Sequence, residues 1–509
     1  MRVLFAGNQG GVPVVQLNLA LADALGRLDA TIVTDFVVWW DAEANLISSC
    51  DVPLGETYTL ETFKRFDEFD PMAETERLVA DYPSVNWSAV MASERSFVDA
   101  SFLLGGAGHR AEDAVYVHRL LARFVRFFEY CFDRAQYDAV ICQTADSLFT
   151  HVLFKVARHF DIPVFAVTPA WLQEGGKPGC FFTNDEYLGC SEMAETYRRL
   201  LKRSLNERER ERAQSFRKSI ISFDGNKAFY SATKRNFGRS PLSPNWRRAL
   251  GYIAANRRLD KDLDYRRFDV AAKVRANFLR LWRSYQCGRF LSRETRPIPR
   301  KSVFFAMHFQ PEQSTLVGGI MHANQVALVE VIAKSLPLGY TLVLKEHPAG
   351  RGSRPAWQYR HMASFPNVQF SDLPSKEIAA CSDAVITITG TIAIEAMALD
   401  KPVVMLGCSF FDYAAVLYRT PHASELPSIL RRILVERDYE KNEERGALID
   451  KFLISYLEAL VPHYPTVDTA EAIAAGLLPR IRKEMASVTT VDSQPQFHPA
   501  PSGTARRHD

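Results

Sequence analysis

The stretch Arg2-Val3-Leu4-Phe5-Ala6-Gly7-Asn8-Gln9-Gly10-Gly11 places a short apolar strand directly before a glycine-bearing turn. A helical pattern follows from Val14 to Leu25, and a second apolar run covers Ala30 to Thr34 and ends at Asp35. The order strand, turn, helix, strand is typical of the start of a Rossmann-like α/β domain. The turn lacks a full G-x-G-x-x-G, so it is a weak signal for nucleotide binding.

The same alternation continues towards residue 190. Strands are predicted at Ala139–Cys142 and Pro163–Val167, with a helix from Ser147 to His159 between them. A long amphipathic helix is predicted from Ala111 to Asp133, because apolar residues recur there at helical spacing. Residues 1–190 therefore predict one Rossmann-like domain.

A second set of alternating elements occupies residues 299–485. Five strands are predicted at 302–307, 340–345, 368–370, 384–389 and 402–406, with helices at 324–335, 376–381 and 391–398 between them. Strands and helices that alternate with short connections predict a parallel sheet with right-handed crossovers. The predicted fold class is α/β, with two Rossmann-like domains that face a cleft.

Residues 191–298 differ from both domains, since they are helical in pattern and rich in arginine. Between Lys202 and Lys301 the chain has 27 Lys/Arg and 9 Asp/Glu, although the whole chain of 509 residues has a net charge of only +3. A basic block of this size usually binds an anionic partner: nucleic acid, a phospholipid surface or a phosphorylated substrate. The polar stretch at 486–509 is predicted to be a disordered tail.

The cellular compartment is predicted from what the sequence lacks. It shows no secretory signal and no run of about 18 uninterrupted apolar residues. Its eight cysteines are scattered and form no C-x-x-C pair, which argues against a structural zinc site and a disulfide framework. We expect reduced thiols in a cytoplasmic protein.

Ligands of parallel α/β sheets bind beyond the carboxyl ends of the strands, so the residues there are the candidates for chemistry. The first cluster is His308-Phe309-Gln310-Pro311-Glu312, directly after the strand at 302–307. Its imidazole, amide and carboxylate suit hydrogen bonding to a sugar or a base. The alternative is a polar loop made rigid by Pro311.

The second cluster is Lys345-Glu346-His347-Pro348, directly after the strand at 340–345. A lysine and a histidine together can neutralise a phosphate, and the histidine can also donate a proton to it. Arg351 and Arg354 could add to such a site. The alternative is an ordinary charged surface loop, which we consider less favoured because the cluster follows a strand end.

The third cluster is Thr387-Ile388-Thr389-Gly390-Thr391, followed by a helix that contains Glu395. Backbone N–H groups and the positive end of the helix dipole predict an anion site, and the hydroxyls add donors. Thr391 with Glu395 close behind is also typical of a helix N-cap, and both interpretations can hold together. The P-loop pattern G-x-x-x-x-G-K-[ST] is absent, which disfavours ATP hydrolysis of that type.

These three clusters, in this order, resemble the capsule polysaccharide biosynthesis glycosyltransferases, a family that includes the bacterial Kdo transferases of capsule export systems. The family's Q-P and H-P pairs correspond here to Gln310-Pro311 and His347-Pro348. The segment from Glu395 to Val403 resembles the E-A…G-K-P-V segment of many GT-B enzymes, with Asp400 where glycine is more usual. The resemblance covers about residues 301 to 413.

The resemblance implies a metal-independent GT-B enzyme with no cofactor other than a nucleotide-sugar co-substrate, for which CMP-Kdo is the first guess. The donor would lie on the second domain and the acceptor on the first. His347 and Lys345 would contact the donor phosphate, together with the Thr389-Gly390-Thr391 turn. The other expected donor-binding residues are His308, Gln310, Glu312, Arg351 and Glu395.

An inverting enzyme would also need a base for the acceptor hydroxyl, and that base would come from the first domain. Asp35, Asp146 and Glu174 lie at or just beyond apolar strands there, and Asp146 ranks first. For each of the three, a helix cap or a solvated loop is the simpler explanation.

Three functions remain open. The first is a glycosyltransferase of capsule or surface polysaccharide assembly whose acceptor is a glycan or a lipid-linked sugar, with the basic module on an anionic membrane surface. The second is a polyol-phosphate transferase of the CDP-glycerol type, or a sugar-nucleotide epimerase, on the same scaffold. A non-enzymatic nucleic-acid-binding protein is the least favoured, because it leaves the three strand-end clusters unexplained.

Overall fold

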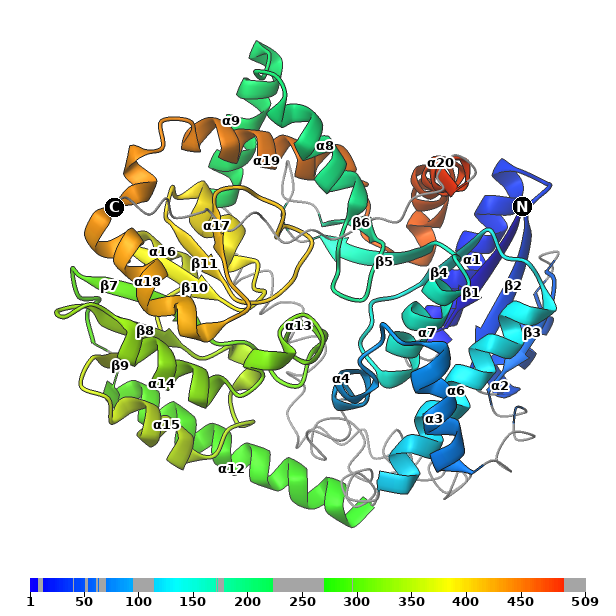
Figure 1. Ribbon diagram of the computed structural model, residues 1–509, viewed down its shortest axis with the longest axis horizontal. Coiled ribbons are helices and arrows are strands. Elements are labelled where there is room, and N and C mark those ends of the chain that lie inside the picture. The colour runs from blue at the N-terminus through cyan, green and yellow to red at the C-terminus, as the bar shows by residue number, and fades with distance from the viewer. Residues whose placement is uncertain are drawn as a thin grey trace, which may run out of the picture.

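A computed structural model describes residues 1–488, apart from residues 8–11, 40, 51–53, 61–62, 64–69, 95–113, 171, 173–177, 223–269 and 295. Two six-stranded sheets organise the molecule, each covered by helices (Figure 1). The first sheet has the strand order β3-β2-β1-β4-β5-β6 and the second β12-β11-β10-β7-β8-β9. The predicted α/β class with two Rossmann-like domains is confirmed.

The first sheet is built from short runs of buried apolar residues. Its parallel strands are β1 (Arg2–Ala6), β2 (Val33–Val38), β3 (Thr57–Thr59), β4 (Ala139–Cys142) and β5 (Val164–Ala170). The edge strand β6 (Gly179–Thr183) runs antiparallel to β5. The helices of this part are α1 (Val12–Leu28), α2 (Asp41–Ser48), α3 (Pro71–Asp81), α4 (Trp87–Ala92), α6 (Ala114–Arg134) and α7 (Leu148–His159).

The strand predicted from Ala30 to Thr34 is displaced in the structure, where β2 begins at Val33 and continues to Val38. Asp35 therefore lies inside the sheet and not beyond its end. Its carboxylate accepts hydrogen bonds from Arg2 Nε at 2.8 Å and from the Tyr137 hydroxyl at 2.6 Å. These partners stabilise a fully buried carboxylate near the start of β1, which excludes Asp35 as the acceptor base.

The second sheet is parallel throughout. Its strands are β7 (Ser302–Ala306), β8 (Thr341–Lys345), β9 (Val368–Phe370), β10 (Ala384–Thr387), β11 (Val403–Met405) and β12 (Leu417–Arg419). Around it lie α13 (Gln313–Leu316), α14 (Gln325–Ser335), α15 (Ala356–Ala363), α16 (Ser375–Cys381), α17 (Ile392–Ala398), α18 (Leu426–Arg431) and α19 (Arg445–Ala459).

The described ends of the predicted basic module pack on the second domain. Helices α8 (Ser191–Leu201) and α9 (Glu207–Ser222) lie against α19, and α12 (Val270–Glu294) lies against α15 and β9 (Figure 1). The alternating charges at the start of α9 are solvated, while Ala213, Phe216 and Ile220 are buried. The arginine pairs between residues 247 and 267 lie outside the described residues.

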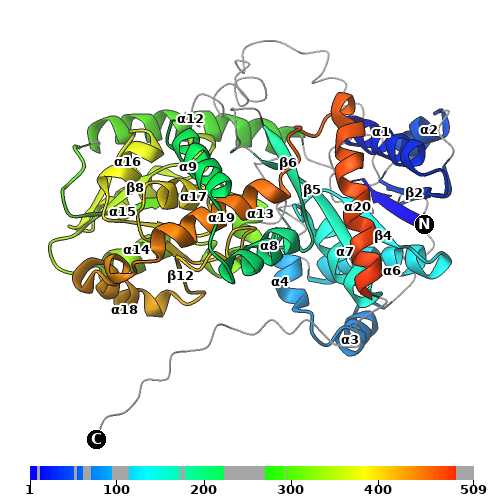
Figure 2. The same cartoon turned by 90° about the horizontal axis from the view of Figure 1, so that it is seen from above.

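The last helix, α20 (Ala470–Val488), returns to the first domain and packs on α1 (Figure 2). Ile473, Ala474, Leu477 and Ile481 are fully buried there, in one cluster with Val3 and Phe5 of β1 and with residues of α1. This packing differs from the predicted division, which assigned residues 299–485 to the second domain. An apolar helix face does not reveal from sequence which sheet it will cover.

Two expectations concern the whole chain. No helix in the described part of the structure is long and apolar enough to cross a membrane. All eight cysteines are free thiols, and five of them are buried. Of the tail predicted at 486–509, residues 486–488 belong to α20, and residues 489–509 lie outside the described residues.

Candidate functional site

The three strand-end clusters lie at one edge of the second sheet. Strand β7 pairs in parallel with β10 on one side and with β8 on the other, so the three strands are neighbours at its centre. Their last residues are Ala306, Lys345 and Thr387, and Ala306 pairs with Lys345 in the register. The structure therefore brings together the loops that carry the predicted second-domain residues.

His308 joins the first loop to the third. The backbone N–H of Thr389 donates to His308 Nε2 over 3.2 Å, so a neutral ring carries its proton on Nδ1. Gln325, which sequence reasoning missed, fixes the His308 backbone through two hydrogen bonds of 2.7 and 3.0 Å. Burial lowers the pKa of His308 to about 3, with smaller effects from the nearby His347 and Arg354, so the imidazole is neutral at pH 7.

A buried ion pair joins the second loop to the first. Arg354 Nη1 lies 2.7 Å from both carboxylate oxygens of Glu346, and its Nη2 donates to the His308 carbonyl at 3.2 Å. The Tyr359 hydroxyl donates to the same carboxylate at 2.7 Å. Arg354 was considered a phosphate ligand from sequence, but these partners make it a positioning residue. The sequence did not identify Glu346 as the partner of Arg354, because neither Glu346 nor Tyr359 stands in a pattern that predicts a buried ion pair.

His347 is oriented by its own loop and by the first loop. Its ring stacks on Phe309 with 5.9 Å between ring centroids, and Nδ1 accepts a hydrogen bond from the Ala349 N–H at 3.2 Å. Burial lowers the pKa of His347 to about 4, although the neighbouring Glu346 acts in the opposite direction. At pH 7 the ring is therefore neutral, with its proton on Nε2. It can donate a hydrogen bond to a phosphate oxygen, but it adds no positive charge.

Lys345 is the last residue of β8, and its side chain is only 7% exposed. Its ammonium donates to the carbonyl of Leu373. Burial lowers the pKa of Lys345, while the nearby Asp372 acts to raise it. The positive charge of Lys345 is therefore largely buried and already bound to a carbonyl.

The turn after β10 is more tightly bonded than its sequence predicts. The Gly390 N–H donates to the Thr387 hydroxyl at 2.9 Å, and the Thr389 hydroxyl donates to the Ser314 carbonyl at 3.0 Å. Two donors expected to face a ligand, the N–H groups of Thr389 and Gly390, are therefore used to hold the turn. Thr391 occupies the N-cap position of α17, and its side chain makes no capping hydrogen bond.

The remaining predicted donor-binding residues surround this centre. Gln310 donates from its amide to the Ala323 carbonyl, and the Glu312 carboxylate accepts from the Ser314 hydroxyl at 3.4 Å. Arg351 forms an ion pair with the half-exposed Asp372. Glu395 lies on α17, where burial raises its pKa and the nearby Lys376 of α16 opposes that effect.

In the first domain, the predicted base Asp146 lies in the loop that follows β4. Asp146 is half-buried there, and its N–H donates to the Thr144 carbonyl at 2.8 Å. The next residue, Ser147, caps α7 through Thr150. Of the two other candidate bases, Asp35 is excluded above and Glu174 lies outside the described residues.

His151, one turn into α7, is a buried residue that sequence reasoning missed. Its Nδ1 lies 2.9 Å from the Ser93 hydroxyl, and burial lowers the pKa of His151 to about 4. A histidine four residues after a helix N-cap was the only sequence signal, and it does not distinguish a core histidine from a functional one.

One side chain connects the candidate site to the first domain. Gln313, in the short helix α13 after the first cluster, donates from its amide to the Glu186 carbonyl at 2.8 Å. The fully buried Glu186 carboxylate forms ion pairs with Lys155 and with Arg158 Nη2, the latter at 3.0 Å. The loop after β7 is thus fixed to a charged cluster on α7 and the β6–α8 connection.

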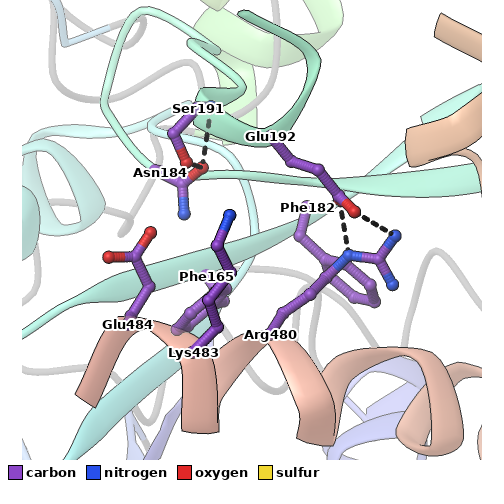
Figure 3. Close-up of a pocket in the computed structure, with 8 residues that line it drawn as sticks. All are labelled: Phe165, Phe182, Asn184, Ser191, Glu192, Arg480, Lys483 and Glu484. Carbon is purple, nitrogen blue, oxygen red and sulfur yellow. Dashed lines mark hydrogen bonds and ion pairs between the residues drawn. The ribbon is translucent and has the colours of Figure 1, made fainter. Parts of the chain in front are cut away.

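A pocket lies elsewhere, between β5, β6, α8 and α20 (Figure 3). Arg480 from α20 pairs with Glu192 through Nε at 2.6 Å and Nη2 at 3.0 Å, and its guanidinium lies 5.2 Å from the Phe182 ring centroid. Because β6 is antiparallel to β5, Asn184 beyond β6 marks the amino end of β5. The pocket and Asp146 are therefore at opposite edges of the first sheet.

Comparison with known proteins bears on the second domain. Residues 264–425 match the family model described as capsule polysaccharide biosynthesis protein, which confirms the predicted resemblance over that range. The matched range contains every predicted site residue of the second domain. No curated protein matches the chain.

Solved structures give weaker similarities. Thermosulfurimonas dismutans KpsC, a beta Kdo 2,4 transferase, is 13% identical over 69% of this chain and 87% of its own, with a TM-score of 0.31. UDP-GlcNAc 2-epimerase from Neisseria meningitidis is 12% identical over 94% and 100%, with a TM-score of 0.24. The calicheamicin glycosyltransferase CalG4 is 15% identical over 94% and 98%, with a TM-score of 0.25. Values this low carry no information about activity.

Proposed function

We propose that this chain, whose residues 264–425 match the capsule polysaccharide biosynthesis family model, is a glycosyltransferase of surface polysaccharide assembly. It would move a sugar from a nucleotide-activated donor to a glycan or a lipid-linked acceptor. The observation that carries the proposal is the coincidence of the family match with the three strand-end loops. The loops meet at the sheet edge where parallel α/β proteins bind their ligands.

The donor phosphate would be held by His347 and by the turn after β10. Glycosyl transfer develops negative charge on the leaving phosphate, and preorganised hydrogen-bond donors stabilise that charge. His347 offers its Nε2–H, because Nδ1 already accepts from Ala349. The exposed Thr391 offers a hydroxyl that caps no helix N–H. Lys345 would add positive charge from below the loop.

The nucleoside and the sugar would contact the remaining predicted residues of this edge, which are His308, Gln310, Glu312, Arg351 and Glu395, while Thr389 and Gly390 belong to the turn that holds the phosphate. Among nucleotide sugars, CMP-Kdo remains the first candidate donor. This choice rests on the resemblance of the Q-P and H-P pairs to the Kdo transferases. No cofactor and no metal ion are required in this proposal.

The acceptor would approach from the first domain. Asp146 is the proposed base for its hydroxyl, because it follows the carboxyl end of β4 and is half-buried. The enzyme would work in the cytoplasm, at the surface of an anionic membrane that presents the acceptor.

A donor panel tests the proposal. The purified full-length chain is incubated with radiolabelled CMP-, UDP-, GDP- and CDP-linked donors, and the transferred group is identified. Sugar transfer from one of these donors supports the proposal. Transfer of phosphoglycerol from CDP-glycerol, or epimerisation of the donor sugar without transfer, would overturn it in favour of another reaction on the same fold.

A further inference from the structure

Helix α12 exposes a row of large apolar side chains. Val274, Phe278, Leu281, Trp282 and Tyr285 are each between 51% and 69% exposed. Their spacing of three, four and seven residues places them on one face of the helix, and we call this face the α12 stripe. The helix runs along one edge of the molecule in both views (Figures 1 and 2). A monomeric protein rarely exposes such a row of apolar side chains to solvent unless the row is a binding surface.

The second half of α12 packs into the core and so fixes the position of the α12 stripe. Cys287 and Leu291 are buried in the cluster that contains β7 and β8. The helix is therefore anchored through its second half, while the stripe occupies its first half.

Charge selects among the surfaces that the α12 stripe could meet. Arg275 and Arg289 are exposed along the same stretch, Arg280 and Arg283 are half-buried, and from Val270 to Arg293 the sequence has no acidic residue. A second copy of this helix would bring arginines against arginines. An anionic surface with an apolar interior complements both features, because aromatic and aliphatic side chains enter the acyl boundary while arginines remain at the headgroups.

The α12 backbone also contacts the loop that follows His347. Gly352 lies so close to α12 that a Cβ there would be 2.4 Å from the Arg280 carbonyl oxygen. Arg280 and Arg283 donate to the carbonyls of Ala349 and Ser353 at 3.3 and 3.4 Å. A surface that binds the stripe therefore contacts the helix that supports the proposed donor site.

We propose that the α12 stripe docks this protein on an anionic phospholipid bilayer. The proposal deepens the proposed function, from which it takes the reason for an enzyme to work at a membrane. The helix would lie in the plane of the headgroups, with Phe278 and Trp282 inserted. This would hold the donor site close to a lipid-linked acceptor.

Vesicle co-sedimentation of the full-length chain tests docking. We expect the protein to bind vesicles that contain phosphatidylglycerol and to bind pure phosphatidylcholine vesicles at least about tenfold more weakly. Added salt should release the bound protein. The double variant Phe278→Ser, Trp282→Ser should lose about tenfold or more in binding. The matched control is Met72→Ser, Val79→Ser on α3, whose side chains are equally exposed, at 61% and 62%. Arg275→Glu should weaken binding, whereas Arg208→Glu on the exposed face of α9 should not.

Docking would be overturned if the wild-type chain did not bind phosphatidylglycerol vesicles, if the double variant bound them as well as the wild type, or if the α3 control lost as much binding as the double variant. It would also be overturned if the wild-type chain bound no vesicles but formed a dimer that the double substitution dissociates. A circular dichroism melt of each variant checks that the variant is still folded. Failure of the proposed function can be distinguished from failure of docking. In that case the protein would still bind vesicles, but it would transfer no sugar from any donor in the panel.

Discussion

The backbone N–H of Thr389 donates to the Nε2 of His308 over 3.2 Å, joining two loops that lie 81 residues apart in the sequence. The bond fixes the tautomer of a buried imidazole and the path of the turn that follows β10. Both loops belong to the candidate site, so changes at this contact should affect donor binding more than they affect the fold.

Gly390 lies directly against this contact. A Cβ on Gly390 would be 2.8 Å from the Thr387 hydroxyl and 3.2 Å from His308 Nε2, so Gly390→Ala must displace one of them. We expect a loss of about 1–3 kcal/mol in the free energy of unfolding and a marked loss of transfer. Gly446→Ala in α19 is the control, since nothing lies within 4 Å of its added Cβ. Urea unfolding and the donor assay measure the two effects. Normal transfer by Gly390→Ala would show that the turn does not need this close approach.

His347 is predicted to act as a neutral hydrogen-bond donor. His347→Ala should lower transfer about 10²- to 10³-fold, the usual cost of removing one donor to a developing anion. His347→Gln keeps an N–H donor and should recover part of the rate. His361→Ala on α15 is the control, because that ring is 46% exposed. Initial rates with saturating donor decide, and wild-type turnover of His347→Ala would refute the role.

The Glu346–Arg354 pair should be far more important for stability than the neighbouring Arg351–Asp372 pair. Arg354→Ala leaves a buried carboxylate unpaired and should cost about 3–5 kcal/mol in the free energy of unfolding. Arg351→Ala breaks a pair whose side chains are 31% and 47% exposed and should cost about 1 kcal/mol or less. Urea titrations of the two variants compare them directly, and equal costs would contradict the assigned difference in burial.

Acid should destabilise the protein through its buried histidines. The pKa values of His308 and His151 lie at about 3 and about 4, below the ordinary value of about 6.5 in an unfolded chain. Their contribution is complete above about pH 6.5 and is lost as the pH falls towards 4, because only the unfolded chain takes up protons there. Each contributes up to about 1.4 kcal/mol per pH unit in that window.

Urea unfolding at several pH values across this window measures the effect. His308→Gln should have a shallower pH dependence than the wild type. Parallel curves for wild type and His308→Gln would indicate that His308 is protonated in the folded protein.

Much of the fold could be predicted from sequence, because buried parallel strands appear as short apolar runs. The predicted bounds at Arg2–Ala6, Ala139–Cys142 and Val368–Phe370 match the structure, and the others differ by up to a few residues. The strands β3, β6 and β12 were missed. Two of them have three residues, and β6 contains Gly179 and Thr183 within a stretch without alternation.

The candidate site could be predicted in its position but not in its bonding. Strand ends of a parallel sheet lie at one edge, so the meeting of the three loops followed from the order of elements. The partners of Arg354 and Lys345 did not follow, because a sequence does not show whether a charged side chain turns inward to a buried carboxylate or a carbonyl. The same limit applies to Asp35. Its position after an apolar run predicts a strand end, whereas its side chain is buried inside the sheet.

The return of α20 to α1 has a consequence for the way this protein is made. Ile473, Leu477 and Ile481 belong to a hydrophobic cluster that also contains residues of β1 and α1, which lie far earlier in the sequence. The first domain cannot close this side of its core until α20 has been made, so segments far apart in the sequence form one folding unit. A fragment that ends at residue 190 lacks α20 and would leave this side of the domain exposed.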